Sequence, residues 1–150
     1  MIVYRISSNN YSGKLQASGI AARWNFARQN VIYTSESRAL ACLENVVHRS
    51  MINMSGLFKT QVIEIPDHLQ IEIIDEKNLQ AGWSTSEKYL ICKELGSAWV
   101  VSGLSPVLKV PSALIPKENN YIIHANHPDF DQIRLLDIEE FSFDPRIKIK

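Results

Sequence analysis

One stretch of the sequence places a strand directly before a helix: Val31-Ile32-Tyr33-Thr34-Ser35-Glu36-Ser37-Arg38-Ala39-Leu40-Ala41-Cys42-Leu43-Glu44. Its first four residues are β-branched or aromatic, which is typical of a short strand. Apolar residues then recur at helical spacing: Ala39, Leu40, Leu43, Val46 and Val47. Ser35 is a natural N-cap and Glu36 would bring negative charge to the first turn, so we expect the helix to follow Ser35 directly. His48 and Arg49 suit its C-terminal end.

Other segments have a similar strand composition. We expect strands at 2–6, 57–65, 69–74, 107–110, 121–124 and 133–136, with a weaker one at 141–143 and a loop at 7–19. A second helix is expected from about Glu87 to Leu95 and on toward Val101, begun by a capping box of Ser84 with Glu87. Because strands and helices mix without a regular strand–helix–strand rhythm, the sequence favours an α+β fold over a doubly wound parallel sheet.

The overall composition narrows the class of protein. The 150 residues carry 16 Lys and Arg against 16 Asp and Glu, so the formal net charge is zero. A chain of this length can build its own core, and we expect a single domain over residues 1–150. The balanced charge lacks the clustered basic excess that is typical of nucleic-acid-binding proteins. Little self-repulsion would oppose association between copies.

The expected compartment follows by elimination. The chain opens without a basic, apolar leader, and it contains no run of 18 apolar residues that could cross a membrane. The cysteines Cys42 and Cys92 are too few for a disulfide framework. They sit in apolar helical contexts, where buried reduced thiols are common. We therefore expect a cytoplasmic protein.

Common catalytic motifs do not occur in this chain. We find no Walker A sequence, no GxGxxG, no HExxH and no GxSxG. His124 and His127 have ligand-like spacing with Asp129 nearby, but the segment reads as a strand end and a turn, so we expect turn histidines and no metal site. Residue chemistry alone leaves the activity of this α+β chain open.

Six blocks in a fixed order carry a resemblance to a known family. They are Tyr4-Arg5, Gly19–Asn25, Val31–Glu44 extended by Val47-His48, Leu95–Trp99, Val110–Ala113 followed by Asn119–Tyr121 and Asn126–Phe130, and Phe143–Arg146. Together they resemble the RES-domain toxins, which are named for Arg, Glu and Ser residues. The match spans nearly the whole chain. It departs from the family pattern at Ala21-Ala22, at Phe26–Gln29, where Arg28 could add a phosphate contact, and at His124.

The resemblance implies a fold and an activity. RES-domain proteins are toxins of type II toxin–antitoxin pairs, usually beside an Xre-like antitoxin, and their fold is similar to that of ADP-ribosyltransferases. This implies mixed or antiparallel sheets with flanking helices, NAD+ as the substrate and no metal. The implied reaction cleaves the nicotinamide–ribose bond, depleting NAD by hydrolysis or phosphorolysis and arresting growth. One alternative is transfer of ADP-ribose to a specific protein, and another is a non-catalytic nucleotide-binding or complex-forming subunit.

The implied partners are an Xre-like antitoxin and a second copy of the chain within a larger toxin–antitoxin complex. Nucleic acid and membrane are not expected as direct partners. The resemblance assigns Arg23, Tyr33 and Glu44 to catalysis. It assigns the following residues to NAD+ binding: Arg5, Tyr4, Trp24 and Ser112.

The residue types suit these roles, and each also has a structural alternative. Arg5 and Arg23 offer forked donors for a pyrophosphate, although either could instead form a surface salt bridge. Tyr33 could stack on nicotinamide or donate its hydroxyl, or it could be a core aromatic. Glu44 flanks the buried stripe of its helix, where it could stabilise a ribose cation or orient a nucleophile, or face water.

Trp24, Trp83 and Trp99 are each expected to pack in the core, with Trp24 also able to line the site. Ser112, at a strand end, could reach a ligand or act as a turn residue.

Overall fold

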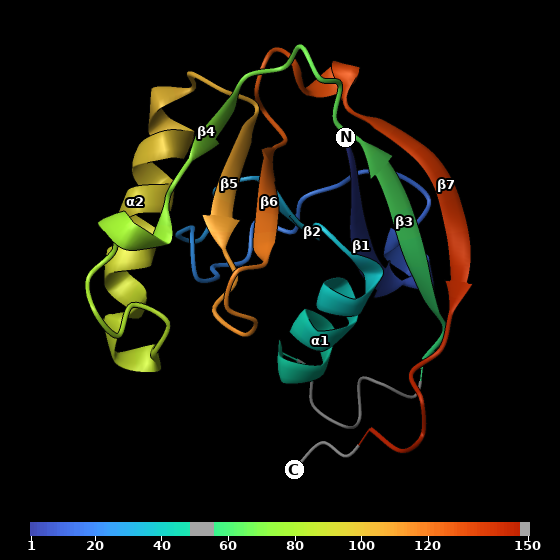
Figure 1. Ribbon diagram of the computed structural model, residues 1–150. Coiled ribbons are helices and arrows are strands. Elements are labelled where there is room, and N and C mark those ends of the chain that lie inside the picture. The colour runs from blue at the N-terminus through green and yellow to red at the C-terminus, as the bar shows by residue number, and fades with distance from the viewer. Residues whose placement is uncertain (49–55, 148–150) are drawn as a thin grey trace.

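The computed structural model describes residues 1–48 and 56–147 (Figure 1). Its strands form one seven-stranded mixed sheet, in the order β4-β5-β6-β2-β1-β3-β7. The strands are β1 (Ile2–Ser8), β2 (Val31–Ser35), β3 (Phe58–Glu64), β4 (Ile71–Ile73), β5 (Val107–Pro111), β6 (Asn119–His124) and β7 (Arg134–Phe141). The α-helices are α1 (Arg38–His48) and α2 (Tyr89–Ser102). The predicted α+β class is confirmed.

The sheet is continuous but narrows sharply at its middle. β2 pairs with β6 along its whole length, whereas β1 and β2 share one residue pair, Tyr4 with Ser35. All pairs are antiparallel except β4 with β5. The sheet therefore consists of two halves, β4-β5-β6-β2 and β1-β3-β7, that meet at the end of β2.

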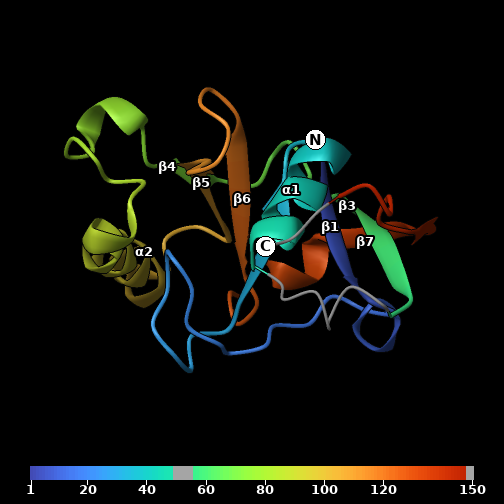
Figure 2. The same ribbon diagram turned by 90° about the horizontal axis from the view of Figure 1, so that it is seen from below.

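Each helix covers a different part of this sheet. α1 packs on β1 and β2, across the junction of the two halves. Figure 2 shows α1 over the middle of the sheet and α2 standing well apart from it, toward the β4 and β5 end. The side chains of Trp99 and Cys92 on α2 pack with Leu108 and Val110 of β5.

The core lies on both faces of the central strands. Ile32 and Ile123 belong to one buried cluster, while their chain neighbours Val31 and Ile122 belong to another. Alternate side chains point to opposite faces of a strand, so burial on both faces explains the unbroken apolar runs of β2 and β6. As expected, Trp24, Trp83 and Trp99 are all buried.

The predicted cap of α1 was wrong. The helix begins at Arg38, and it is Ser37 whose Oγ accepts a hydrogen bond from the Leu40 amide, at 3.1 Å. Ser35 is the last residue of β2, and its hydroxyl donates to Asn120 Oδ1 at 2.7 Å. The Ser35 side chain is therefore engaged with β6 and does not cap the helix, although the local sequence predicts a cap there. Arg49 lies outside the described residues.

The predicted capping box of α2 was also wrong. Residues 86–88 form a single 3-10 turn, and Lys88, which precedes the helix, makes no side-chain capping bond. The helix extends to Ser102 and ends at Gly103, whose φ of 58° is left-handed. The carbonyl of Ser84 instead accepts a hydrogen bond from Arg23.

Several strand boundaries also differ from the predicted ones. β1 continues to Ser8 and is followed by a 3-10 turn at residues 9–11, within the predicted loop. β4 covers residues 71–73 alone. β7 is one strand over residues 134–141, which includes the stretch between the two predicted late strands but only the first residue of 141–143. Cys42 and Cys92 are free thiols, and burial raises the pKa of both. Among the described residues, no helix is long and apolar enough to cross a membrane.

Gly96 sets how closely α2 approaches the segment that carries Arg23 and Trp24. A Cβ at this position would lie 1.8 Å from the carbonyl oxygen of Trp24, so the helix can pack there only as glycine. One residue further on, Ser97 Oγ accepts a hydrogen bond from Gln29 Nε2 at 2.7 Å. α2 therefore packs against the loop between β1 and β2 and contacts it at Trp24 and Gln29.

We predict that Gly96→Ala lowers the free energy of unfolding by about 1–3 kcal/mol, because backbone must move to admit the methyl group. Gly13→Ala is the matched control, since a Cβ there would meet nothing within 4 Å. It should change stability by less than about 0.5 kcal/mol. Urea unfolding followed by tryptophan fluorescence measures both. Equal stability of the two variants would contradict the close approach.

Candidate active site

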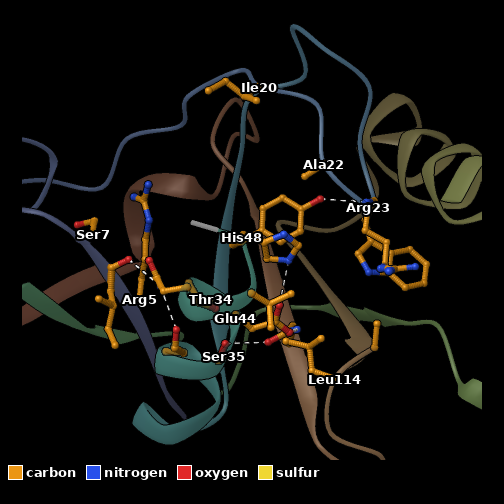
Figure 3. Close-up of a pocket in the computed structure, with 18 of the residues that line it drawn as sticks. Arg5, Ser7, Ile20, Ala22, Arg23, Thr34, Ser35, Glu44, His48 and Leu114 are labelled. Carbon is orange, nitrogen blue, oxygen red and sulfur yellow. Dashed lines mark hydrogen bonds and ion pairs between the residues drawn. The ribbon is translucent and has the colours of Figure 1, made fainter. Parts of the chain in front are cut away.

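A cavity of about 660 Å³ opens where the two halves of the sheet separate (Figure 3). Its walls come from β1, β2, α1, the loop at 18–24 and the start of α2, together with the end of β5, residues 113–114 and Asn120 of β6. Six of the seven predicted site residues line it: Tyr4, Arg5, Arg23, Trp24, Tyr33 and Glu44. Ser112 is not a lining residue, although its neighbours Pro111 and Ala113 are. Residues from distant parts of the chain thus converge on one site.

Glu44 projects from α1 with three polar partners, and its side chain is only 22% exposed. Oε1 accepts hydrogen bonds from Asn120 Nδ2 at 2.6 Å and from Ser112 Oγ at 3.4 Å. Oε2 lies 3.4 Å from His48 Nε2. Glu44 is therefore mostly buried, and the alternative in which it simply faces water does not apply.

Two opposing effects act on the ionisation of Glu44. Burial alone would raise its pKa, but hydrogen bonds from His48, Asn120 and Ser112, with the charge of His48, outweigh burial. The pKa of Glu44 is therefore lowered from its ordinary value. The side chain is an anion at neutral pH.

The hydroxyl of Tyr33 links β2 to the loop that carries Arg23 through two hydrogen bonds. Its hydroxyl donates to Asn25 Oδ1 at 2.8 Å and accepts from the Trp24 amide at 3.0 Å. Burial raises the pKa of Tyr33, more than the bond from Trp24 lowers it, so the phenol stays neutral. The Tyr33 hydroxyl thus already has one acceptor and one donor partner within the protein. The residue also lines the cavity.

Arg23 is held by neutral groups. Its Nη1 and Nη2 atoms donate to the carbonyls of Trp83 and Ser84 at 3.2 and 3.0 Å, and its guanidinium lies 4.4 Å from the centre of the Tyr89 ring. None of these partners carries a negative charge. A guanidinium has five N–H donors, so this arrangement fixes its plane and leaves donors for an anion.

The other predicted residues surround these groups. Arg5 lies mid-strand in β1 and donates to the Gln16 carbonyl at 3.1 Å. The Tyr4 ring packs against the guanidinium of Arg38, at 4.3 Å from its centre. Trp24 is 3% exposed with its ring 6.0 Å from that of Trp83, as the core-packing alternative describes. Arg28 is exposed and does not line the cavity.

Ser112 sits beneath the site and has a turn role as well. Its Oγ accepts hydrogen bonds from the Leu114 and Ile115 amides, each at 3.1 Å. The same oxygen donates to Glu44. Its contact with the site therefore runs through the carboxylate.

Sequence reasoning missed two residues of this site, His48 and Asn120. His48 lies four residues after Glu44, a spacing that brings helical side chains together and could have identified the pair. Asn120 falls in the Asn119–Tyr121 block of the resemblance, but it is 76 residues from Glu44 in the chain, and nothing in the local sequence links the two. Away from the cavity, His127 is a turn residue whose Nδ1 accepts from the Asp129 amide, as predicted. Within residues 1–48 and 56–147, no cluster of three His, Cys, Asp or Glu could hold a metal.

A family model described as RES domain matches residues 2–144. The chain belongs to the RES domain family. The predicted family resemblance is thereby confirmed, and the cavity described above lies within the matched residues.

Curated relatives of this RES-domain chain are similar along most of its length. A protein of Sphingobium sp. (strain YBL2) named Prs ADP-ribosylating toxin is 35% identical, over 83% of this chain and 79% of the relative. Toxin Res of Yersinia enterocolitica is 31% identical over 99% of this chain and 100% of the relative.

Among solved structures, the M. tuberculosis MbcT-MbcA toxin-antitoxin complex contains a chain with the same fold. The TM-score is 0.77 at 14% identity, covering 94% of this chain and 84% of that one. At this identity, the likeness concerns the fold alone.

We predict that Tyr33→Phe destabilises the RES domain, because the Trp24 amide and Asn25 Oδ1 each lose a partner. An unsatisfied buried polar group costs about 1–3 kcal/mol, and we expect a loss of free energy of unfolding in that range. Tyr11→Phe removes the same atom from a side chain that is 59% exposed and should be nearly neutral. If denaturant unfolding finds the two variants alike, Tyr33 does not tether the loop.

Proposed function

We propose that this protein is the toxin of a toxin–antitoxin pair, and that it binds NAD+ in the cavity and cleaves the nicotinamide–ribose bond. One observation carries the proposal: an ionised, half-buried Glu44 shares a cavity with Arg5 and Arg23. The relatives named as toxins support the biological role.

The charges in the cavity suit a dinucleotide with a pyrophosphate. Arg5 comes from β1 and Arg23 from the loop, and each presents a fork that matches phosphate oxygens. The rings of Tyr33 and Tyr89 offer apolar surface for a planar ring such as nicotinamide. This combination of largely apolar walls with a few convergent charged groups is typical of cofactor sites.

The proposed reaction begins with rupture of the bond between ribose C1 and the nicotinamide nitrogen. Both bonding electrons leave with nicotinamide, which becomes neutral, and the ribose passes through a state resembling an oxocarbenium ion. The carboxylate of Glu44 stabilises this positive charge. Water then attacks C1 and gives up a proton, which Glu44 can accept. The products are ADP-ribose, nicotinamide and a proton, or ADP-ribose phosphate and nicotinamide if phosphate attacks.

A second candidate is transfer of ADP-ribose to a protein. The Sphingobium relative named as an ADP-ribosylating toxin favours it. The same bond breaks first, and only the nucleophile differs. A non-catalytic subunit is less well supported, because a fold that merely forms a complex does not require a half-buried carboxylate in a cavity with two arginines.

We further propose an antitoxin partner, Xre-like as the family resemblance implies, and a homodimer within the larger complex. The M. tuberculosis neighbour was solved in a toxin-antitoxin complex, which supports the first of these. We also propose that the protein acts in the cytoplasm, as the sequence predicts.

We predict that purified protein releases nicotinamide from NAD+, and that its induction lowers cellular NAD and arrests growth. Glu44→Gln and Arg23→Ala should each slow release at least about 100-fold, because each removes charge stabilisation in the transition state. Glu94→Gln makes the same change on the exposed face of α2 and should match the parent. Chromatography of the products, with and without phosphate, gives the rates.

The products also separate the two candidates. Free ADP-ribose or its phosphate identifies depletion, and label from NAD+ on a macromolecule identifies transfer. If wild-type protein and the two cavity variants behave alike in every assay, the site assignment is wrong.

A further inference from the structure

The two oxygens of the Glu44 carboxylate have different surroundings. Oε1 is bound from the sheet side by Asn120 Nδ2 at 2.6 Å, with Ser112 Oγ at 3.4 Å. The partner of Oε2 is His48 Nε2 at 3.4 Å, on a side chain that is 58% exposed at the cavity wall. One oxygen is therefore anchored in the protein, and the other faces a group in contact with solvent.

The orientation of the Asn120 amide is itself set by a second bond. Ser35 and Asn120 are register partners in β2 and β6, and the Ser35 hydroxyl donates to Asn120 Oδ1 at 2.7 Å. Both residues are buried, at 4% and 9% exposure. Because Oδ1 is engaged by this donor, Nδ2 is the atom turned toward Glu44. A flipped amide would place Oδ1 against the carboxylate, and both would be acceptors.

We propose that Asn120, oriented by Ser35, is a positioning residue that holds Glu44 Oε1 and so leaves Oε2 to meet the reacting ribose. This rests on the proposed function only in the identity of the reacting group. The chain of hydrogen bonds from Ser35 through Asn120 to Glu44 stands on geometry alone, and Figure 3 shows Ser35, Glu44 and His48 around the cavity.

Ser112 is a weaker candidate for the same role. Its contact with Oε1 is longer than that of Asn120, and its oxygen also accepts two amide hydrogen bonds within the turn after β5. Replacing Ser112 would change the turn and the carboxylate together. Asn120 can be replaced with fewer side effects, because its side-chain partners are Ser35 and Glu44.

Other ionisable groups share the cavity and would affect a titration of Glu44. They are Tyr4 and Arg5 of β1, Arg23 of the loop, Tyr33 of β2, His48 of α1 and Tyr89 of α2. None of them is a side-chain hydrogen-bond partner of Asn120, whose partners are Ser35 and Glu44. A shift in the Glu44 titration on replacing Asn120 therefore reports the lost hydrogen bond.

The test is a direct titration of the Glu44 side-chain carbonyl by carbon-13 NMR in the full-length protein. In wild type, the midpoint should lie below the ordinary glutamate pKa, because Glu44 gains hydrogen bonds in the fold. In Asn120→Ala the midpoint should rise by about one pH unit, since a bond to a charged group is lost. Asn120→Asp should raise it further, because a second carboxylate would face the first. Ser35→Ala should shift it in the same direction by a smaller amount.

Asn119→Ala is the matched control on the same strand. Its Nδ2 donates to Glu36 Oε2 at 3.1 Å, away from Glu44. The Glu44 midpoint should not move in this variant. If Asn120→Ala does not fold, Ser35→Ala carries the test, because it leaves the amide in place without its orienting donor.

Kinetics with NAD+ separate positioning from binding. Asn120→Ala should lower kcat at least about tenfold with little change in KM, and its acid limb should move to higher pH with the NMR midpoint. A Glu44 midpoint equal to wild type in Asn120→Ala and Ser35→Ala would overturn the proposal, whatever the activity. If the midpoint rises as expected but wild type does not act on NAD+, positioning of Glu44 stands and the proposed function fails.

Discussion

The hydrogen bond from Asn120 to Glu44 joins the centre of the sheet to the helix that covers it. A carboxylate with a side chain only 22% exposed loses much of its hydration, so the fold must supply donors in place of water. Asn120 supplies the shortest of these contacts, at 2.6 Å. This bond ties α1 to β6 at the cavity and, together with His48 and Ser112, keeps Glu44 ionised despite its burial.

A second constraint gives the cavity its place. β1 and β2 share a single residue pair, so the two halves of the sheet separate beyond it, and side chains of both strands are left facing the opening. Two contacts hold the opposite wall: the Tyr33 hydroxyl binds the Trp24 amide, and Gly96 admits the Trp24 carbonyl against α2. The loop that carries Arg23 is therefore held through both the amide and the carbonyl group of Trp24.

Local sequence predicted most of this architecture, because strand periodicity and apolar runs are local signals. It failed where distant segments compete for one residue. Ser35 has the side-chain chemistry of a helix cap, but its hydroxyl donates a hydrogen bond to Asn120 of β6. Ser37 caps the helix instead. Residues 133–136 and 141–143 were predicted as separate strands, yet pairing with β3 forms one strand over residues 134–141.

The same distinction applies to the site. The family resemblance led to six residues that do line the cavity, but Ser112 touches it only through Glu44. His48 could have been found from its helical spacing with Glu44. Asn120 lies in one of the blocks that carry the resemblance, but its role could not be predicted, because it depends on the register between β2 and β6 and on the contact across the sheet with α1.

A crystal structure of Glu44→Gln with NAD+ bound tests the proposed site directly. We predict nicotinamide ribose beside the side chain at position 44, with the pyrophosphate hydrogen-bonded to Arg5 and Arg23. NAD+ bound outside the cavity, or inside it with the ribose turned away from position 44, would show that the site assignment is wrong.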